Sequence, residues 1–266
     1  MATQPAIAII PARYGSTRFP GKPLANKTGK PLIQHVFEAV QSASAITRII
    51  IATDDPRIER VVKAFGGQAV MTRSNHANGT SRIAEVVANL PEQNDQLVVN
   101  IQGDEPQVDS QVIDQLVRAL AEDKTSPMAT VASPFGDDED SKDPNIVKVV
   151  VDQQNHALYF SRSAIPYDRD RTNIKPLKHL GVYAYRRDFL LKYVALPPTP
   201  LEQAEQLEQL RALENGFPIT VIQTQTPHHG IDTPQQYEAF VKNFIETIYP
   251  NSIITKNSST RNIPSI

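Results

Sequence analysis

Ala6-Ile7-Ala8-Ile9-Ile10 is an uninterrupted apolar run, and a basic loop, Pro11-Ala12-Arg13-Tyr14-Gly15-Ser16-Thr17-Arg18-Phe19-Pro20-Gly21-Lys22-Pro23-Leu24, follows it directly. A run without polar alternation predicts a strand buried on both faces of a parallel sheet. The stretches Arg48–Ala52 and Leu97–Ile101 repeat the pattern. We therefore expect three neighbouring buried strands.

Between these runs the apolar residues take the period of amphipathic helices, with faces over 32–40, 58–65, 83–90 and 112–120. This alternation predicts an α/β fold, a Rossmann-like and mainly parallel central sheet. Shorter strands over 128–135, 146–151, 157–161 and 181–185 predict an inserted antiparallel portion. We also expect a helix over 199–214, a strand over 217–223 and a last helix opened by the capping box Thr233-Pro234-Gln235-Gln236. Residues 1–249 are interpreted as one domain and residues 250–266 as a disordered tail.

Composition excludes several classes of protein. The 266 residues carry 27 basic and 29 acidic side chains, a net charge of -2, which gives no field for attracting nucleic acid. The chain has no cysteine, so thiol chemistry and disulfides are excluded, and this fits a reducing compartment. The first residues resemble no signal peptide and no stretch has the length of a membrane span. We expect a soluble, cytoplasmic protein without membrane insertion.

The basic loop is the first candidate binding site. It lies between a buried strand and a helix, where open α/β sheets bind ligands. Arg13, Arg18 and Lys22 provide three cations in a loop without Asp or Glu, which suits a triphosphate, and we interpret Lys22 as an exposed loop cation. Five residues separate Gly15 from Gly21, so the loop is not a Walker A motif. An exposed basic loop without a ligand is the alternative.

The run IPARYGSTRFPGKPLA resembles the sugar nucleotidyltransferases, in particular the 3-deoxy-manno-octulosonate (Kdo) cytidylyltransferase family. The resemblance covers residues 6 to 245 and continues in order through further blocks: 51–55, 99–106, 159–166, 178–183, 207–211 and 230–234. It implies transfer of a cytidylyl group from CTP to a 3-deoxy-octulosonate sugar acid for lipopolysaccharide synthesis, with Mg²⁺ as cofactor, in a homodimer.

The same resemblance assigns roles to residues. It implies nucleotide binding by a set from the first half of the chain: Ala12, Arg13, Ser16, Arg18, Lys22, Asn78, Gly79, Arg82 and Gln102. Within the site it implies catalytic roles for Arg13, Lys22 and Asp104. It implies binding of the sugar acid by a second set: Gln102, Arg162, His179, Tyr183, Glu208 and Gln209. We expect His179 and Tyr183 on one face of a strand, and Glu208 and Gln209 on the helix over 199–214.

Asp104 and Asp232 are the candidate metal ligands. Asp104 follows the third buried strand and Asp232 precedes the last helix. Mg²⁺ usually takes one or two carboxylates together with substrate oxygens. Asp232 also suits an ordinary turn at a helix N-terminus, and the resemblance favours the metal.

One block departs from the family pattern. The family has Ser-Gly-Thr, an acidic residue and Arg, whereas this chain has Asn78-Gly79-Thr80-Ser81-Arg82. Because this block borders the base in the family, we expect weaker or broader nucleotide use. Alternatives are a cytidylyltransferase for a related acid such as 8-amino-Kdo or a sialic acid, a transferase that uses another nucleotide, and a non-catalytic nucleotide-binding relative.

Overall fold

The computed structural model describes residues 5–16, 18–91, 96–137, 139–226 and 230–248. The strands are β1 (Ala6–Ala12), β2 (Ile46–Thr53), β3 (Gln68–Met71), β4 (Leu97–Asn100), β5 (Met128–Pro134), β6 (Lys148–Val151), β7 (Ala157–Ser161), β8 (Leu177–Arg186) and β9 (Ile219–Gln223). The helices are α1 (Leu32–Gln41), α2 (Pro56–Ala64), α3 (Gly79–Ala88), α4 (Ser110–Glu122), α5 (Arg187–Tyr193), α6 (Pro200–Glu205), α7 (Leu210–Glu214) and α8 (Pro234–Ile248), with a 3₁₀ turn η1 at Lys22–Leu24. The predicted tail, 250–266, lies outside the described residues.

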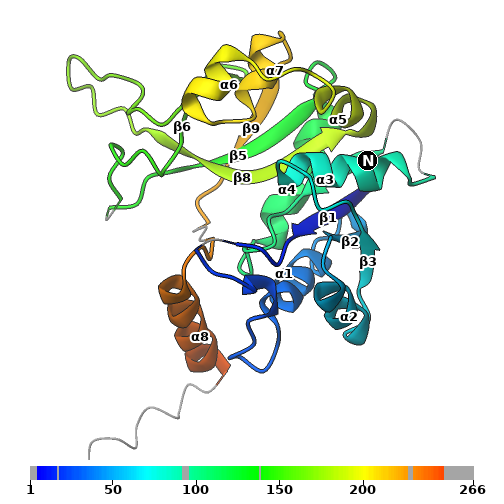
Figure 1. Cartoon of the computed structure of the whole chain (residues 1–266). Helices are drawn as coiled ribbons and strands as arrows, with labels where there is room; N and C mark the ends of the chain where they lie inside the picture. Colours follow the sequence, from blue (N-terminus) through cyan, green and yellow to red (C-terminus); the bar gives the residue numbers. More distant parts are fainter. Residues whose placement is uncertain (1–4, 17, 92–95, 138, 227–229, 249–266) are drawn as a thin grey trace, which may run out of the picture.

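The strands form one sheet in the order β3-β2-β1-β4-β8-β5-β9, and off this path β6 pairs with β8 and β7 pairs with β6. Figure 1 shows β1, β2 and β3 at one end of the sheet and β5, β8 and β9 at the other. β1 is parallel to both β2 and β4, whereas β8 is antiparallel to β4 and β5. The predicted fold class is confirmed: a Rossmann-like parallel half continues into an antiparallel portion. The carboxyl ends of β1 and β4 are adjacent, since Ile9 pairs with Asn100.

Helices cover both faces of the sheet, which explains why β1 is apolar throughout. Ala8 and Ile10 belong to the apolar cluster that includes residues of α1, α2 and α4, and Ile7 and Ile9 belong to the cluster that includes residues of α3, α5 and α7. Among the described residues, none of the helices combines the length and apolar character that a bilayer crossing requires.

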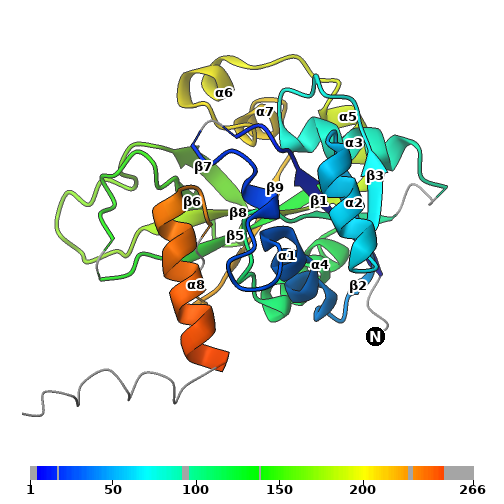
Figure 2. The ribbon, with the colours of Figure 1, turned by 60° about the horizontal axis from the view of Figure 1, so that its bottom comes forward.

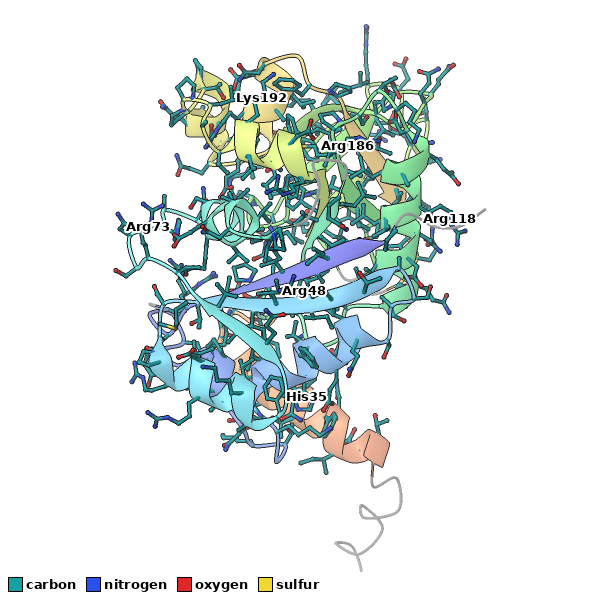
Figure 3. The ribbon with its side chains drawn as sticks, turned by 90° about the vertical axis from the view of Figure 1, so that its right-hand side faces the viewer. His35, Arg48, Arg73, Arg118, Arg186 and Lys192 are labelled. Carbon is teal, nitrogen blue, oxygen red and sulfur yellow. The ribbon has the colours of Figure 1, made fainter. Side chains whose placement is uncertain are left out.

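Helix α8 belongs to a third, aromatic cluster beside α1 and the basic loop (Figure 2). The Phe19 ring from the loop lies 5.7 Å from the Tyr237 ring, and His35 of α1 makes edge contacts with Phe240 and Phe244 at 5.2 and 4.7 Å. In Figure 3, His35 is labelled on α1, next to α8. This cluster attaches the last helix to the loop that follows the first strand.

Two elements were not predicted and one prediction was wrong. β3 and α5 carry no clear periodic pattern of their own. The expected helix over 199–214 is broken into α6 and α7, because Gln206 adopts a left-handed conformation (φ 53°, ψ 48°). The Arg162 guanidinium from the end of β7 donates to the carbonyls of Glu205 and Gln206, which satisfies backbone groups that a continuing helix would use itself.

Gly103 fixes the spacing between the loops that leave β1 and β4. A Cβ at this position would lie 2.8 Å from the Pro11 carbonyl oxygen. We expect Gly103→Ala to lower the free energy of unfolding by about 1–3 kcal/mol, because backbone must shift to admit the methyl group. Denaturant unfolding measures this. Gly15→Ala is the control: a Cβ there meets nothing within 4 Å, so its change should stay within about 0.5 kcal/mol. Equal effects of the two variants would contradict the steric argument.

Candidate active site

A cavity of about 370 Å³ opens at the carboxyl ends of β1 and β4. In open α/β sheets, ligands bind in a crevice outside the carboxyl ends of the strands, and this cavity lies at that position. Its lining includes every predicted nucleotide-binding residue and both predicted metal ligands: Ala12, Arg13, Ser16, Arg18, Lys22, Asn78, Gly79, Arg82, Gln102, Asp104 and Asp232. Segments more than 200 positions apart in the sequence therefore meet in one cavity.

The basic loop is folded back on itself before it reaches Lys22. Gly21 has φ 71°, a conformation that glycine adopts without strain, and its N–H donates to the Tyr14 carbonyl at 3.0 Å. The Tyr14 ring lies under the Arg57 guanidinium, 3.4 Å from the ring centre. The 3₁₀ turn η1 then begins at Lys22 and directs its side chain across the cavity floor.

Lys22 is buried, so the expectation that it is an exposed loop cation was wrong. Its side chain is only 11% exposed. The Nζ atom donates to Asp104 Oδ2 at 2.6 Å, to the Ile231 carbonyl at 2.6 Å and to Asp232 Oδ1 at 3.4 Å. The ammonium thereby joins the two predicted metal ligands to the basic loop.

The two carboxylates fit a hard divalent cation. Asp104 and Asp232 approach the same Nζ atom, and their side chains remain 27% and 44% exposed toward the cavity. Oxygen ligands from two carboxylates, completed by substrate phosphates, are what Mg²⁺ prefers. No group of three or more metal-ligating side chains occurs in the described part of the chain, so substrate oxygens would be needed to complete the coordination.

The other two cations of the loop differ in their partners. Arg13 is exposed and has no ion pair with another described residue. Arg18 is 66% exposed and lies 3.1 Å from Asp232 Oδ1. Both guanidinium groups line the cavity, where each can donate to phosphate oxygens.

The N-terminus of α3 forms another wall of the cavity. Asn78 caps the helix, its Oδ1 accepting from the Ser81 N–H at 2.9 Å, and Gly79 is the first helical residue. The positive end of the helix dipole therefore faces the cavity. Arg82 is 4% exposed and pairs with Asp54 at 2.9 Å, so its charge is neutralised within the fold. Ser81, at the divergent position, contacts His76 at 3.2 Å.

A second cavity, of about 290 Å³, adjoins the first and shares Gly79 and Gln102 with it. Five of the six predicted sugar-acid residues line it: Gln102, His179, Tyr183, Glu208 and Gln209. The rings of His179 and Tyr183 lie 5.3 Å apart, as expected for one face of a strand. Thr130 and Val131 are adjacent in β5 but pair with Tyr183 and Leu180 of β8, so β8 contains two extra residues at this point. Because two is an even number, His179 and Tyr183 still lie on the same face of β8.

Glu208 lies in the break between α6 and α7, and burial raises its pKa. Its Oε2 accepts from the Thr80 hydroxyl at 2.9 Å. Thr80 lies on α3 beside the predicted nucleotide-binding positions and is not among the residues predicted from the sequence. Its place directly after Asn78-Gly79 is the signal that would have found it. This hydrogen bond lies within the second cavity and links Glu208 to α3, whose residue Gly79 lines both cavities.

Arg162 is the one predicted sugar-acid residue outside this second cavity. Its guanidinium donates to three backbone carbonyls, those of Pro144, Glu205 and Gln206. In this arrangement it supports the end of α6. A role in binding the sugar carboxylate stays a prediction.

Comparison with known proteins identifies the class. Residues 7–223 match the family model described as cytidylyltransferase, so the fold and site define a cytidylyltransferase and the chain is a nucleotidyltransferase enzyme. Relatives from Syntrophotalea carbinolica (49% identical, covering 86% of this chain and 94% of that protein) and Syntrophobacter fumaroxidans (51%, 88% and 95%) are both named 3-deoxy-manno-octulosonate cytidylyltransferase. The chain belongs to the 3-deoxy-manno-octulosonate cytidylyltransferase family.

Solved structures agree with this. The structure of CMP:2-keto-3-deoxy-manno-octonic acid synthetase complexed with CTP is similar with a TM-score of 0.86 and 43% identity, over 91% of this chain and 99% of that one. The inositol-1-phosphate CTP transferase from T. maritima shares the fold alone, with a TM-score of 0.64 and 14% identity, over 93% of this chain and 98% of that one.

The burial of Lys22 predicts a cost in stability. We expect Lys22→Met to lower the free energy of unfolding by about 1–3 kcal/mol, because two neighbouring carboxylates lose their shared cation; their partial exposure keeps the loss below that of a fully buried pair. Arg18→Met is the matched control and should cost less than about 1 kcal/mol. Denaturant unfolding compares them. A Lys22→Met protein as stable as the wild type would show that the ammonium does not support the fold.

Proposed function

We propose that the chain activates 3-deoxy-manno-octulosonate with CTP, giving the CMP-sugar and pyrophosphate for lipopolysaccharide synthesis. The observation that carries this proposal is the pair of adjoining cavities with a common wall at Gly79 and Gln102. One is lined by cations and the N-terminus of a helix, and the other by aromatic, amide and carboxylate groups. The names of the relatives support CTP and the octulosonate as the two substrates.

In the proposed reaction the anomeric hydroxyl of the sugar attacks the α-phosphorus in line. A P–O bond forms between the sugar oxygen and the α-phosphorus, the bond to pyrophosphate breaks, and the hydroxyl proton passes to water. Arg13 and Arg18 bind the phosphates from the cavity rim, while Lys22 neutralises charge from its floor. Catalysis consists of positioning and electrostatic stabilisation, and no covalent intermediate on the enzyme is required.

We propose Mg²⁺ as the cofactor, held by Asp104 and Asp232. When bound, the ion neutralises charge on the phosphate oxygens. The chain's own contribution is to keep the two carboxylates together through Lys22.

We also propose that the protein forms a homodimer and acts in the cytoplasm. Leu158, Tyr167 and Ile174 are 62%, 88% and 55% exposed on β7 and on the segment between β7 and β8. Such apolar side chains are suited to a contact with a second copy. The absence of cysteine fits a reducing compartment.

The direct test is pyrophosphate release with four nucleoside triphosphates crossed with Kdo, 8-amino-Kdo and a sialic acid. We expect turnover with CTP and Kdo together, and none with CTP alone. Because Ser81 stands where the family has an acidic residue, we also expect weak turnover with Kdo and a second nucleoside triphosphate. Equal rates with the sialic acid would favour the related transferase, and no turnover with any pair would favour a non-catalytic relative.

The metal assignment predicts non-additive losses. If Asp104 and Asp232 hold one ion, the double variant Asp104→Asn/Asp232→Asn should be little worse in kcat/KM than the worse single variant. A Mg²⁺ titration of all four proteins measures this. Losses that multiply independently, or wild-type metal dependence in Asp232→Asn, would leave Asp232 as a turn residue.

A further inference from the structure

Asn100 is a buried polar residue that the fold does not satisfy. It is the last residue of β4, is 1% exposed, and pairs with Ile9 of β1 and Tyr183 of β8. Its side-chain oxygen has no hydrogen-bond partner among the described residues. The residue lines the second cavity. Because no described protein group bonds this oxygen, its hydrogen-bonding capacity is open to a group that enters the cavity.

The strand pattern shows that an apolar residue would suit the position better. Alternation places Asn100 on the same sheet face as Val98, which packs in the apolar cluster with Met128 and Tyr185. Valine at position 100 would continue that cluster. The sequence shows the same anomaly, since Asn100 interrupts the apolar run Leu97–Ile101.

We propose that Asn100 is a specificity-determining residue that accepts a hydrogen bond from a hydroxyl of the sugar acid. This inference rests on the proposed function. The unpartnered oxygen is an acceptor, so a ligand group that bonds it must be a donor, as a sugar hydroxyl is. Gln209 supports this, because its buried Nε2 also lacks a partner among the described residues and lines the same cavity. One acceptor and one donor together suit a polyhydroxylated ligand.

The test is Asn100→Val, read out by three measurements. We expect the ligand-free protein to melt a few degrees higher, the KM for Kdo to rise about tenfold, and the Kd for CTP to stay within twofold. A residue with a merely structural role would show the opposite shift in melting temperature and no selective change in KM. Ser126→Ala is the matched control: its buried hydroxyl is also unpartnered among the described residues but lines neither cavity, so the KM should not change.

Monodeoxy analogues of Kdo identify the hydroxyl. The wild type should use one analogue with a KM about tenfold above that of Kdo, and Asn100→Val should not distinguish that analogue from Kdo. Wild-type turnover with an unchanged KM in Asn100→Val, or a variant less stable than the wild type, overturns the inference alone. Absence of sugar-dependent pyrophosphate release in the wild type overturns the proposed function and this inference with it.

Discussion

The ammonium of Lys22 is the contact on which the site depends. It lies within hydrogen-bond distance of the carboxylates of Asp104 and Asp232 and of the Ile231 carbonyl. These groups come from the loop after β1, the loop after β4 and the segment before α8. Without the cation, two carboxylates would face each other at the cavity floor and repel. The same charge therefore stabilises the fold and holds together the two carboxylates that we propose as metal ligands.

The α3 N-terminus gives the site its second organising element. Gly79 lies in the wall of both cavities, and the next residue, Thr80, donates to Glu208. A shift of this helix end on binding of the nucleotide would change the position of a carboxylate in the neighbouring cavity. If this movement changes the affinity for the sugar by some factor, thermodynamic linkage requires that the bound sugar change the affinity for the nucleotide by the same factor.

The sequence predicts the parallel half of the fold well because its signals are local. The apolar run of β1 and the helical period of α4 each reflect burial of one element. The break at Gln206 depends on carbonyl contacts with Arg162, 44 positions away, and no local pattern contains it. The burial of Lys22 was missed for the same reason, since its partner at Ile231 is 209 positions away. The set of cavity residues was accessible through resemblance, whereas their pairings required the structure.

The distance in sequence between Lys22 and Ile231 also has a consequence for biosynthesis. Domains form as the chain emerges from the ribosome, N-terminal parts first. The ribosome makes strand β1 and its basic loop about 200 residues before the carbonyl of Ile231 and the carboxylate of Asp232 that contact Lys22. During that interval the nascent chain carries the basic loop without two of the three groups that contact the Lys22 ammonium. A translation product that stops before the segment leading into α8 would lack both of these contacts.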